Sequence, residues 1–349
     1  MTAASAFGQG SGVQKGPATR PAAATGIPAG GAANVMRPIG SIDFYGLYRL
    51  SADRLREALT FKVGDTIALA DRSFFTVSER RLMAVPGVLH TRLDIVCCEN
   101  ARYLVYVGIE EAGAPTLHFR PAPTGSIRLP PDLVQAGADL DRVVLEAALS
   151  GHADEDDSEG HMLLKDAAAR PAEDRVIELA QGNVPLLRRV LRASADAEQR
   201  AIAAQLLGYA GDMQSVVPDL VYAMSDPSAG VRNNAMRALA VFGKATKVRS
   251  PRVPYAPFVT LLNSPVWGDR NKATFALFGM ARKRDPALLK LLRERALTPL
   301  VEMARWRSQD HAQAPFWILG CIAGFSDQDI YSAWTHGDRE RVIQAALAR

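Results

Sequence analysis

Two segments of the chain, residues 199–211 and 231–243, follow the same residue pattern. Aligned, QRAIAAQLLGYAG and VRNNAMRALAVFG place Leu207 over Leu239, 32 residues apart, and end on the same glycine. Each segment predicts an amphipathic helix with a small residue in mid-face and a glycine stop. A repeat of this length is typical of stacked helical units, none of which can bury its apolar face alone. We therefore expect a helical solenoid, whose surface is suited to holding another molecule.

The repeat continues, less regularly, through residues 172–349. Leu277 and Leu319 occupy the position of Leu207 and Leu239, and the spacing grows to 38 and 42 residues. A final pair of helices is expected near the end of this stretch. The other predicted helices are Asp174–Arg192, Ala195–Tyr209, Met213–Met224, one begun by Asp226, Tyr255–Leu262, Asp269–Ala281, Pro286–Arg305 and Ala312–Ala323.

Local signals mark two of these helices. Gly182 and Pro185 lie inside the first helix, which we expect to break there. Asp226 followed by Pro227 predicts an N-cap with proline in the first turn.

The recurrent Asp, Arg, Ala, Leu and Gly of the doubled segment resembles the HEAT repeat family over roughly residues 172–349. The later copies are degenerate, since Ala312 stands where the doubled segment has arginine. The resemblance implies an all-α solenoid. In some members of the family His-Glu pairs bind two iron ions, but this chain has no His-Glu dipeptide, which excludes that branch.

A shorter block with strands precedes the solenoid. A strand at residues 41–45 ends at Gly46, and Ser51 is the expected N-cap of a helix. The next helix, residues 74–84, is expected to bury Phe74, Val77 and Leu82. Two strands follow, residues 88–97 and 102–111. In the first, Leu89, Leu93 and Ile95 are expected to face the core, and in the second Tyr103, Val105, Val107 and Ile109.

This β-α-α-β-β block resembles a POTRA domain, the polypeptide-transport-associated module of bacterial envelope proteins. The resemblance covers residues 39–112, and the order of its parts carries it rather than any one motif. It implies that Val88–Val96 is the edge strand of the sheet. Only one copy is present, and no alternating barrel strands follow it. The residues that carry it are Ile42–Gly46, Ser51–Leu59, Val63–Asp65, VPGV at 85–88 and Ile109–Glu111.

The expected fold class is therefore α+β, in four segments. Residues 1–38, rich in Ala, Gly and Pro, predict a disordered leader. Residues 39–112 are the POTRA-like domain. Residues 113–171 form a connector with one helix at 138–150 and an acidic loop at 154–159. Residues 172–349 form the solenoid.

Composition and motifs give no reason to expect an enzyme. With 48% hydrophobic and 22% charged residues, the chain of 349 residues has the composition of an ordinary globular protein. Its six histidines form no metal-ligand set and no HExxH motif. Cys97 and Cys98 are neighbours on a strand and should face opposite ways, and Cys321 is expected in the core. We expect no catalytic residue, metal or cofactor.

Three arginines, Arg200, Arg232 and Arg270, occupy equivalent helix positions. They could form a ladder in which each arginine binds an acid or carbonyl of the neighbouring repeat. They could instead form a basic stripe on the surface that binds an acidic ligand. The pattern favours the ladder.

A second group of cations lies mostly in loops, where no ladder needs them. Residues 244–307 hold 14 basic and four acidic side chains. Loop charge of this kind can maintain solubility. Concentrated on one edge of a solenoid, it could also bind a nucleic acid or another polyanion. The cluster consists of Lys244, Lys247, Arg249, Arg252, Arg282, Lys283 and Arg284.

The edge strand is the third candidate. A sheet edge can accept an extended peptide as an added strand, through main-chain hydrogen bonds. The alternating polar residues His90, Arg92 and Asp94 could equally protect that edge from aggregation.

We therefore expect a non-enzymatic scaffold that binds a polypeptide partner. The alternative is nucleic-acid or polyanion binding at residues 244–284, and a HEAT-like lyase of the phycobilin type ranks last. No stretch approaches the roughly 18–20 apolar residues that span a bilayer. As written the sequence predicts a cytoplasmic protein, but the POTRA resemblance implies the envelope or periplasm if the start is misassigned. The sequence does not indicate the oligomeric state.

Overall fold

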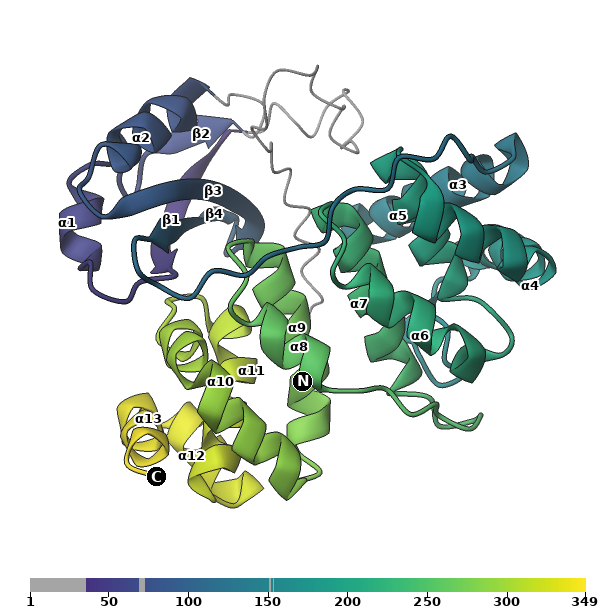
Figure 1. The fold of residues 1–349 in the computed structure, drawn as a ribbon. Helices are drawn as coiled ribbons and strands as arrows, with labels where there is room; N and C mark the ends of the chain where they lie inside the picture. The colour runs from purple at the N-terminus through teal and green to yellow at the C-terminus, as the bar shows by residue number, and fades with distance from the viewer. Residues whose placement is uncertain (1–35, 69–72, 151, 153) are drawn as a thin grey trace. The chain divides into compact units, whose positions relative to one another are not determined.

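In the computed structural model, the residues whose structure can be described are 36–68, 73–150, 152 and 154–349. They form two compact units. Residues 36–117 and 259–349 together make the first, which we call the sheet unit. Residues 118–258 make the second, the repeat unit. Figure 1 shows both, and residues 1–35 of the expected leader lie outside the described part.

The sheet unit combines a small sheet with helices from both ends of the sequence (Figure 1). Its elements are β1 (Met36–Tyr45), α1 (Ala52–Arg56), β2 (Thr66–Ala68), α2 (Ser73–Met83), β3 (Val88–Glu99), β4 (Arg102–Glu111), α9 (Trp267–Ala281), α10 (Pro286–Ala304), α11 (Gln309–Ala323), α12 (Asp327–Thr335) and α13 (Arg339–Leu347).

The sheet has the strand order β2-β1-β4-β3. β4 pairs parallel with β1 and antiparallel with β3, so that β3 is an edge strand. The sequence predicted three strands and missed β2. The turn at Gly64 and Asp65 sends the chain back along β1, where the amide of Ile39 donates to the carbonyl of Asp65 at 2.9 Å. β2 then pairs antiparallel with the start of β1.

One face of the sheet carries the predicted core. The four residues expected on one face of β4, from Tyr103 to Ile109, are buried there with side chains of α1 and α2. Two predictions on this face were wrong. Val77 is 46% exposed, and Phe75 is buried in its place, while the side chain of Phe74 lies outside the described residues. Leu89 is 50% exposed because the register of β3 shifts between Val88 and His90.

The other face of the sheet is also covered. The Tyr106 ring stacks on Trp267 of α9, with ring centroids 5.0 Å apart, and lies 4.7 Å from Trp306 after α10. Leu104, on the same strand, is buried too. β4 is therefore buried on both faces, as a central strand between two helical layers should be. The last helices of the predicted solenoid thus pack on the sheet.

The repeat unit is almost entirely helical (Figure 1). α8 (Ala256–Leu261) spans its boundary with the sheet unit. The other elements are α3 (Pro131–Ser150), β5 (Glu155–Asp156), β6 (Leu163–Leu164), the 3₁₀ helix Ala167–Ala169, α4 (Arg170–Ala193), α5 (Ala197–Leu207), α6 (Met213–Ala223) and α7 (Ala229–Phe242).

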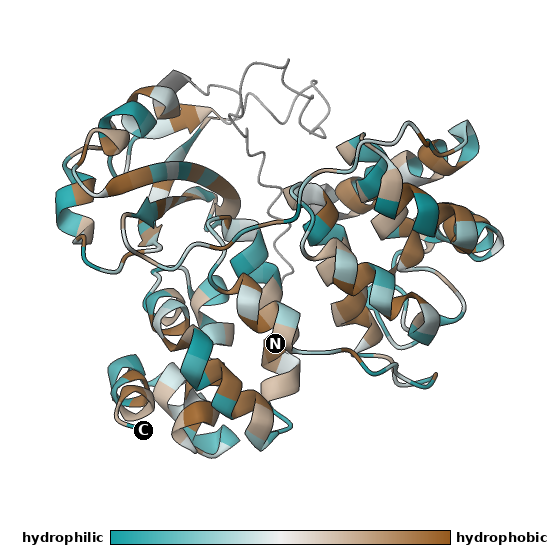
Figure 2. Ribbon diagram, viewed as in Figure 1, coloured by the Kyte–Doolittle hydropathy of each residue, from teal (hydrophilic) through white to brown (hydrophobic). Residues whose placement is uncertain are grey.

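The repeat predicted from the doubled segment is confirmed. Leu207, Leu239, Leu277 and Leu319 are all fully buried. Figure 2 shows the resulting mixture of hydrophobic and hydrophilic residues along each helix.

Two local predictions for these helices were wrong. α4 continues through Pro185, because Leu187 and Val190 bury the same apolar face beyond it. The N-cap of α7 is Ser228 and not Asp226, whose carboxylate accepts hydrogen bonds from the amide of Ser228 at 2.9 Å and from Arg200.

Candidate functional site

Arg200 is buried against the turn that joins α6 and α7. Its Nε and Nη2 each donate to one carboxylate oxygen of Asp226 at 2.9 Å. Nη1 donates to the carbonyls of Ser194 and Ala195. Both side chains are almost completely buried. The pair therefore links one helical repeat to the next by a charge-assisted, bidentate contact.

Arg232 and Arg270 are also buried and hydrogen-bonded. Nη1 of Arg232 donates to the carbonyls of Asp226 and Pro227, at 2.6 and 3.0 Å. Arg270 donates to the carbonyl of Ser264 and, from Nη1, to the Glu302 carboxylate at 3.0 Å. Both arginines are at most 4% exposed. All three arginines lie below the surface. Arg200 and Arg270 each bind an acid of the following repeat, as the ladder predicts. Arg232 binds carbonyls of the turn before its own helix.

The connector after residue 117 uses the same ladder. The Arg120 guanidinium pairs with Asp226 and lies 4.2 Å from the centroid of the Tyr222 ring. The backbone amide of Arg120 donates to the carbonyl of Ser225 at 3.0 Å. Beside it, the Phe119 ring lies 3.7 Å from the Arg232 guanidinium carbon. Two consecutive connector side chains are therefore bound by the α6–α7 turn and by α7.

Further along, the connector follows the α4–α5 turn as an extended chain. The amide of Gly125 donates to the carbonyl of Ala193 at 2.9 Å, and the amide of Ala195 donates to the carbonyl of Gly125 at 2.7 Å. A Cβ at position 125 would lie 2.5 Å from the carbonyl oxygen of Ala193, so this close approach requires glycine. The amide of Leu129 donates to the Gln199 side chain at 2.7 Å. The repeat unit therefore holds a stretch of extended polypeptide along its turns.

In the sheet unit, two carboxylates accept hydrogen bonds from the backbone amides of the loop after β1. Glu302 of α10 accepts hydrogen bonds from the amides of Gly46 and Leu47, at 2.9 and 3.1 Å. Glu111 at the end of β4 accepts those of the next three residues, Tyr48, Arg49 and Leu50. Gly46 has φ of 83°, which favours glycine. These bonds fix the loop between β4 and the helices.

A polar cluster lies beneath this loop, on the second face of the sheet. The Tyr45 hydroxyl is 3.3 Å from the Asp94 carboxylate and 3.1 Å from the carbonyl of Pro265. The Arg270 guanidinium carbon lies 4.9 Å from the Tyr45 ring centroid, as Arg232 lies near Phe119. Asp94 is 4% exposed, which corrects its prediction as a polar residue of the outer edge. Its carboxylate serves the internal contact with Tyr45.

The other two edge residues stay near the surface. His90 is exposed and Arg92 is half-buried. Within the described residues β3 pairs only with β4, so its other edge has no strand partner there.

Ion pairs within the repeat unit neutralise part of the basic cluster. Lys244 pairs with Asp157 at 2.6 Å, and Lys247 lies 3.6 Å from both Asp156 and Glu159. These acids belong to the loop predicted as a solvated acidic run, which therefore binds the basic loop of the same unit. Such pairs leave less positive charge for a polyanion.

The remaining cations of the cluster are divided between the two units. Arg249 and Arg252 lie in the repeat unit. Arg282, Lys283 and Arg284 lie in the sheet unit, where Arg282 and Arg284 both pair with Asp327. These pairs are largely exposed and contribute little to stability.

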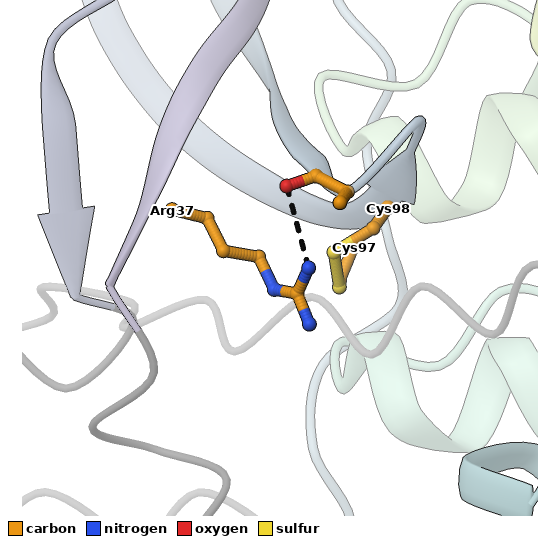
Figure 3. Close-up of a disulfide and its surroundings, with 4 residues drawn as sticks. Arg37, Cys97 and Cys98 are labelled. Carbon is orange, nitrogen blue, oxygen red and sulfur yellow. Dashed lines mark hydrogen bonds between the residues drawn. A yellow bond between two sulfur atoms is a disulfide. The ribbon is translucent and has the colours of Figure 1, made fainter.

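Cys97 and Cys98 form a disulfide across one peptide bond at the end of β3 (Figure 3). The sequence predicted opposite faces, but the register of β3 shifts between Val96 and Glu99, so strict alternation does not hold there. In the same view, Nη1 of Arg37 donates to the carbonyl of Ala101 at 3.3 Å. The third cysteine, Cys321, is buried with a free thiol, as expected.

Several residues of these contacts carry no signal in the sequence. Asp226 was interpreted as a cap, and the aspartate before a proline gave no signal of its arginine partners. Glu302 lies on a predicted helix, with no motif to distinguish it. Only the Phe119-Arg120 pair, aromatic and basic in a Pro-rich connector, offered a usable signal.

The described residues hold no group of three or more His, Cys, Asp or Glu side chains that could bind a metal ion. Within the same residues, no helix combines the length and the apolar character needed to cross a membrane.

Residues 184–277 match the family model of HEAT repeats. This match supports a helical repeat protein. No curated protein matches the sequence. A designed armadillo repeat protein in complex with the peptide (KR)4 is 19% identical, with a TM-score of 0.34, over 62% of this chain and 98% of its own. Computationally designed armadillo repeat proteins for modular peptide recognition reach a TM-score of 0.36 at 19% identity, over the same shares.

A third solved structure, the complex of CpcE and CpcF of phycocyanin lyase from Nostoc sp. PCC7120, has a TM-score of 0.21 at 17% identity. It covers 67% of this chain and 99% of its own. At these scores none of the three likenesses bears on function.

Proposed function

We propose that this chain is a non-enzymatic scaffold that binds an extended polypeptide. The observation that carries the proposal is the connector, which the turns of the repeat unit hold through main-chain hydrogen bonds at Arg120 and Gly125. Main-chain bonds of this kind depend little on sequence, so a surface that offers them suits a polypeptide ligand.

The free edge of β3 is the proposed contact for the partner. β3 runs from Val88 to Glu99, long enough to pair with an added strand along much of its length. Leu89, at 50% exposure, offers an apolar contact beside that edge. Strand addition would supply affinity through the backbone, and side chains such as Leu89 would supply selectivity.

We also propose that β1, α1, α2, β3 and β4 are a POTRA-like module, and that the chain works with polypeptides of the bacterial envelope. The edge position of β3, which the resemblance implied, supports this identity. The extra strand β2 and the helices over the second face depart from the pattern. Fractionation of cells that produce the chain from its own gene, with an antibody against it, tests the location. Recovery only with cytosolic proteins would contradict it.

A peptide display library tests the scaffold function. Peptides selected on the full chain should lose binding when their alternate amides are N-methylated, because methylation removes the main-chain donors. Leu89→Lys at the edge should weaken binding about tenfold, which is roughly 1.4 kcal/mol.

The matched control is Val77→Lys, which changes a side chain of similar exposure (46%) on α2. It should leave the affinity unchanged. Enrichment of no peptide, or equal binding by the N-methylated peptides, would contradict strand addition.

A further inference from the structure

The sheet unit contains a cleft of about 660 Å³. Residues of β1, of α1, of the loop after α1 and of the turn after α10 line it. Its apolar lining residues are Ile42, Leu59 and Phe61, each at most 8% exposed, and Val63, which is 41% exposed. The volume lies within the range of pockets that bind small molecules or peptide side chains, roughly 300–1,000 Å³.

Three cations line the same cleft: Arg56, Lys62 and Arg307. Among the described residues, no carboxylate forms an ion pair with any of the three. The Arg56 guanidinium carbon lies 5.3 Å from the Phe44 ring centroid, which orients it without neutralising it. Lys62 and Arg307 have exposed side chains.

Two acids oppose these charges, and each is already engaged. Asp65, which also lines the cleft, accepts a hydrogen bond from the amide of Lys62 at 2.9 Å. Asp43, buried beside the cleft, accepts one from the amide of Arg307 at 3.1 Å. Counted together, three cations and two carboxylates leave one positive charge in excess. Within the part of the chain that the structure describes, none of the three cationic side chains donates a hydrogen bond, so their donors can serve a ligand.

We propose that this cleft binds an acidic segment of the partner polypeptide, with carboxylates against Arg56, Lys62 and Arg307 and an apolar side chain on its apolar lining. The proposal rests on the proposed function, since it names the chemistry of the partner. Arginine suits this role because its planar guanidinium binds carboxylates in a bidentate manner. The exposed side chain of Val63 favours a polypeptide over a bare polyanion, because an aliphatic side chain next to the carboxylates can be buried against it.

The test uses the full chain and a fluorescent peptide that alternates Glu and Leu, with fluorescence anisotropy at low and high salt. The chain should bind this peptide, and the analogue with Gln in place of Glu should bind about tenfold more weakly. The variant Arg56→Gln, Lys62→Gln, Arg307→Gln should lose about tenfold or more in affinity.

A matched variant removes three other exposed cations of the sheet unit: Arg54→Gln, Arg80→Gln, Lys283→Gln. It should bind the peptide within about twofold of the original chain. The single change Arg307→Gln, on the surface, guards against a triple variant that fails to fold, and should weaken binding in the same direction. Circular dichroism checks that each variant is folded.

Equal binding by the cleft variant and the original chain would overturn the assignment, as would equal binding of the Gln analogue. Stronger competition by duplex DNA than by the acidic peptide would make the cleft a polyanion site instead and also overturn it. If the cleft variant keeps all binding while Leu89→Lys loses the display-selected peptides, the scaffold function stands and the cleft proposal fails.

Discussion

The hydroxyl of Tyr106 lies 2.6 Å from Nδ1 of His311, although 205 positions separate the two residues. The bond joins the central strand of the sheet to the first turn of α11. Burial lowers the pKa of His311 to about 4, and Lys272 adds to the effect. Burial also raises the pKa of Tyr106 well above its usual range. At neutral pH the phenol therefore keeps its proton and donates a hydrogen bond to an uncharged imidazole.

This contact makes stability depend on pH. The folded pKa of His311 lies below the ordinary value of about 6.5, so the unfolded chain binds more protons between pH ~6.5 and pH ~4. The stability that the neutral imidazole contributes is present above pH ~6.5 and is lost as the pH falls through that window. Between pH ~7 and pH ~5 the loss should be about 2 kcal/mol. Urea unfolding of the original chain and of His311→Gln, at both pH values, measures it.

The difference in unfolding free energy between these two proteins should shrink by that amount on acidification. His90→Gln, which changes an exposed histidine, should not alter the pH dependence. A difference that is independent of pH would show that His311 is not held neutral by burial.

Asp226 should be critical for the repeat unit. Asp226→Asn leaves the buried guanidinium of Arg200 without a counter-charge, and Arg120 loses the same partner. Removing one member of a buried ion pair costs about 3–5 kcal/mol. Chemical denaturation of the full chain measures the loss. Glu178→Gln, which breaks an exposed pair with Arg175, is the control and should cost less than about 1 kcal/mol. Equal effects of the two substitutions would refute the ladder.

Glu302 should control the order of the loop after β1. Glu302→Gln keeps one acceptor oxygen but replaces the other by an NH₂ group, which cannot accept from an amide. The amides of Gly46 and Leu47 should then exchange with solvent about tenfold faster or more. Site-resolved hydrogen exchange detects this, and Glu294→Gln on the exposed side of α10 provides the comparison. Unchanged exchange at both amides would mean that Glu302 does not order the loop.

The cysteines give a simple count. In protein purified without reductant, the Cys97–Cys98 disulfide leaves Cys321 as the one free thiol, and it is buried. A thiol reagent should find no reactive group in the native chain, one after denaturation and three after reduction. Three thiols in the denatured, unreduced chain would contradict the disulfide.

The solenoid could be predicted from the sequence because its signal is local and repeated. Leu207 and Leu239 fall on the same face of equivalent helices, and this periodicity survives whatever packs around them. The arginine ladder followed from the same alignment, since Arg200 and Arg232 repeat at the same interval. The continuity of α4 was not predicted correctly. Pro185 predicts a break, but buried leucines on both sides of it stabilise one continuous helix.

The covered second face of the sheet could not be predicted in the same way. Tyr106 alternates with Val105 and Val107, a pattern that fits a strand with one solvated face as well as a strand buried on both faces. The second face of β4 is buried because Trp267 and Trp306, which lie far along the chain, pack on Tyr106. A single sequence does not indicate which residues so far apart will be in contact. For the same reason, Asp94 was interpreted as a surface residue.

The sheet with helices from both ends of the sequence has a consequence for synthesis. Residues 36–117 leave the ribosome before residues 259–349 are synthesised. During that interval Tyr106 lacks its aromatic neighbours Trp267 and Trp306. The sheet unit can close only after its last helices are made, across contacts such as Phe44 with Trp306 that span 262 positions. Contacts of such separation fold slowly and expose apolar surface in the meantime. The nascent sheet is thus the part of this protein most exposed to misassembly, and a chaperone that shields it would protect the whole chain.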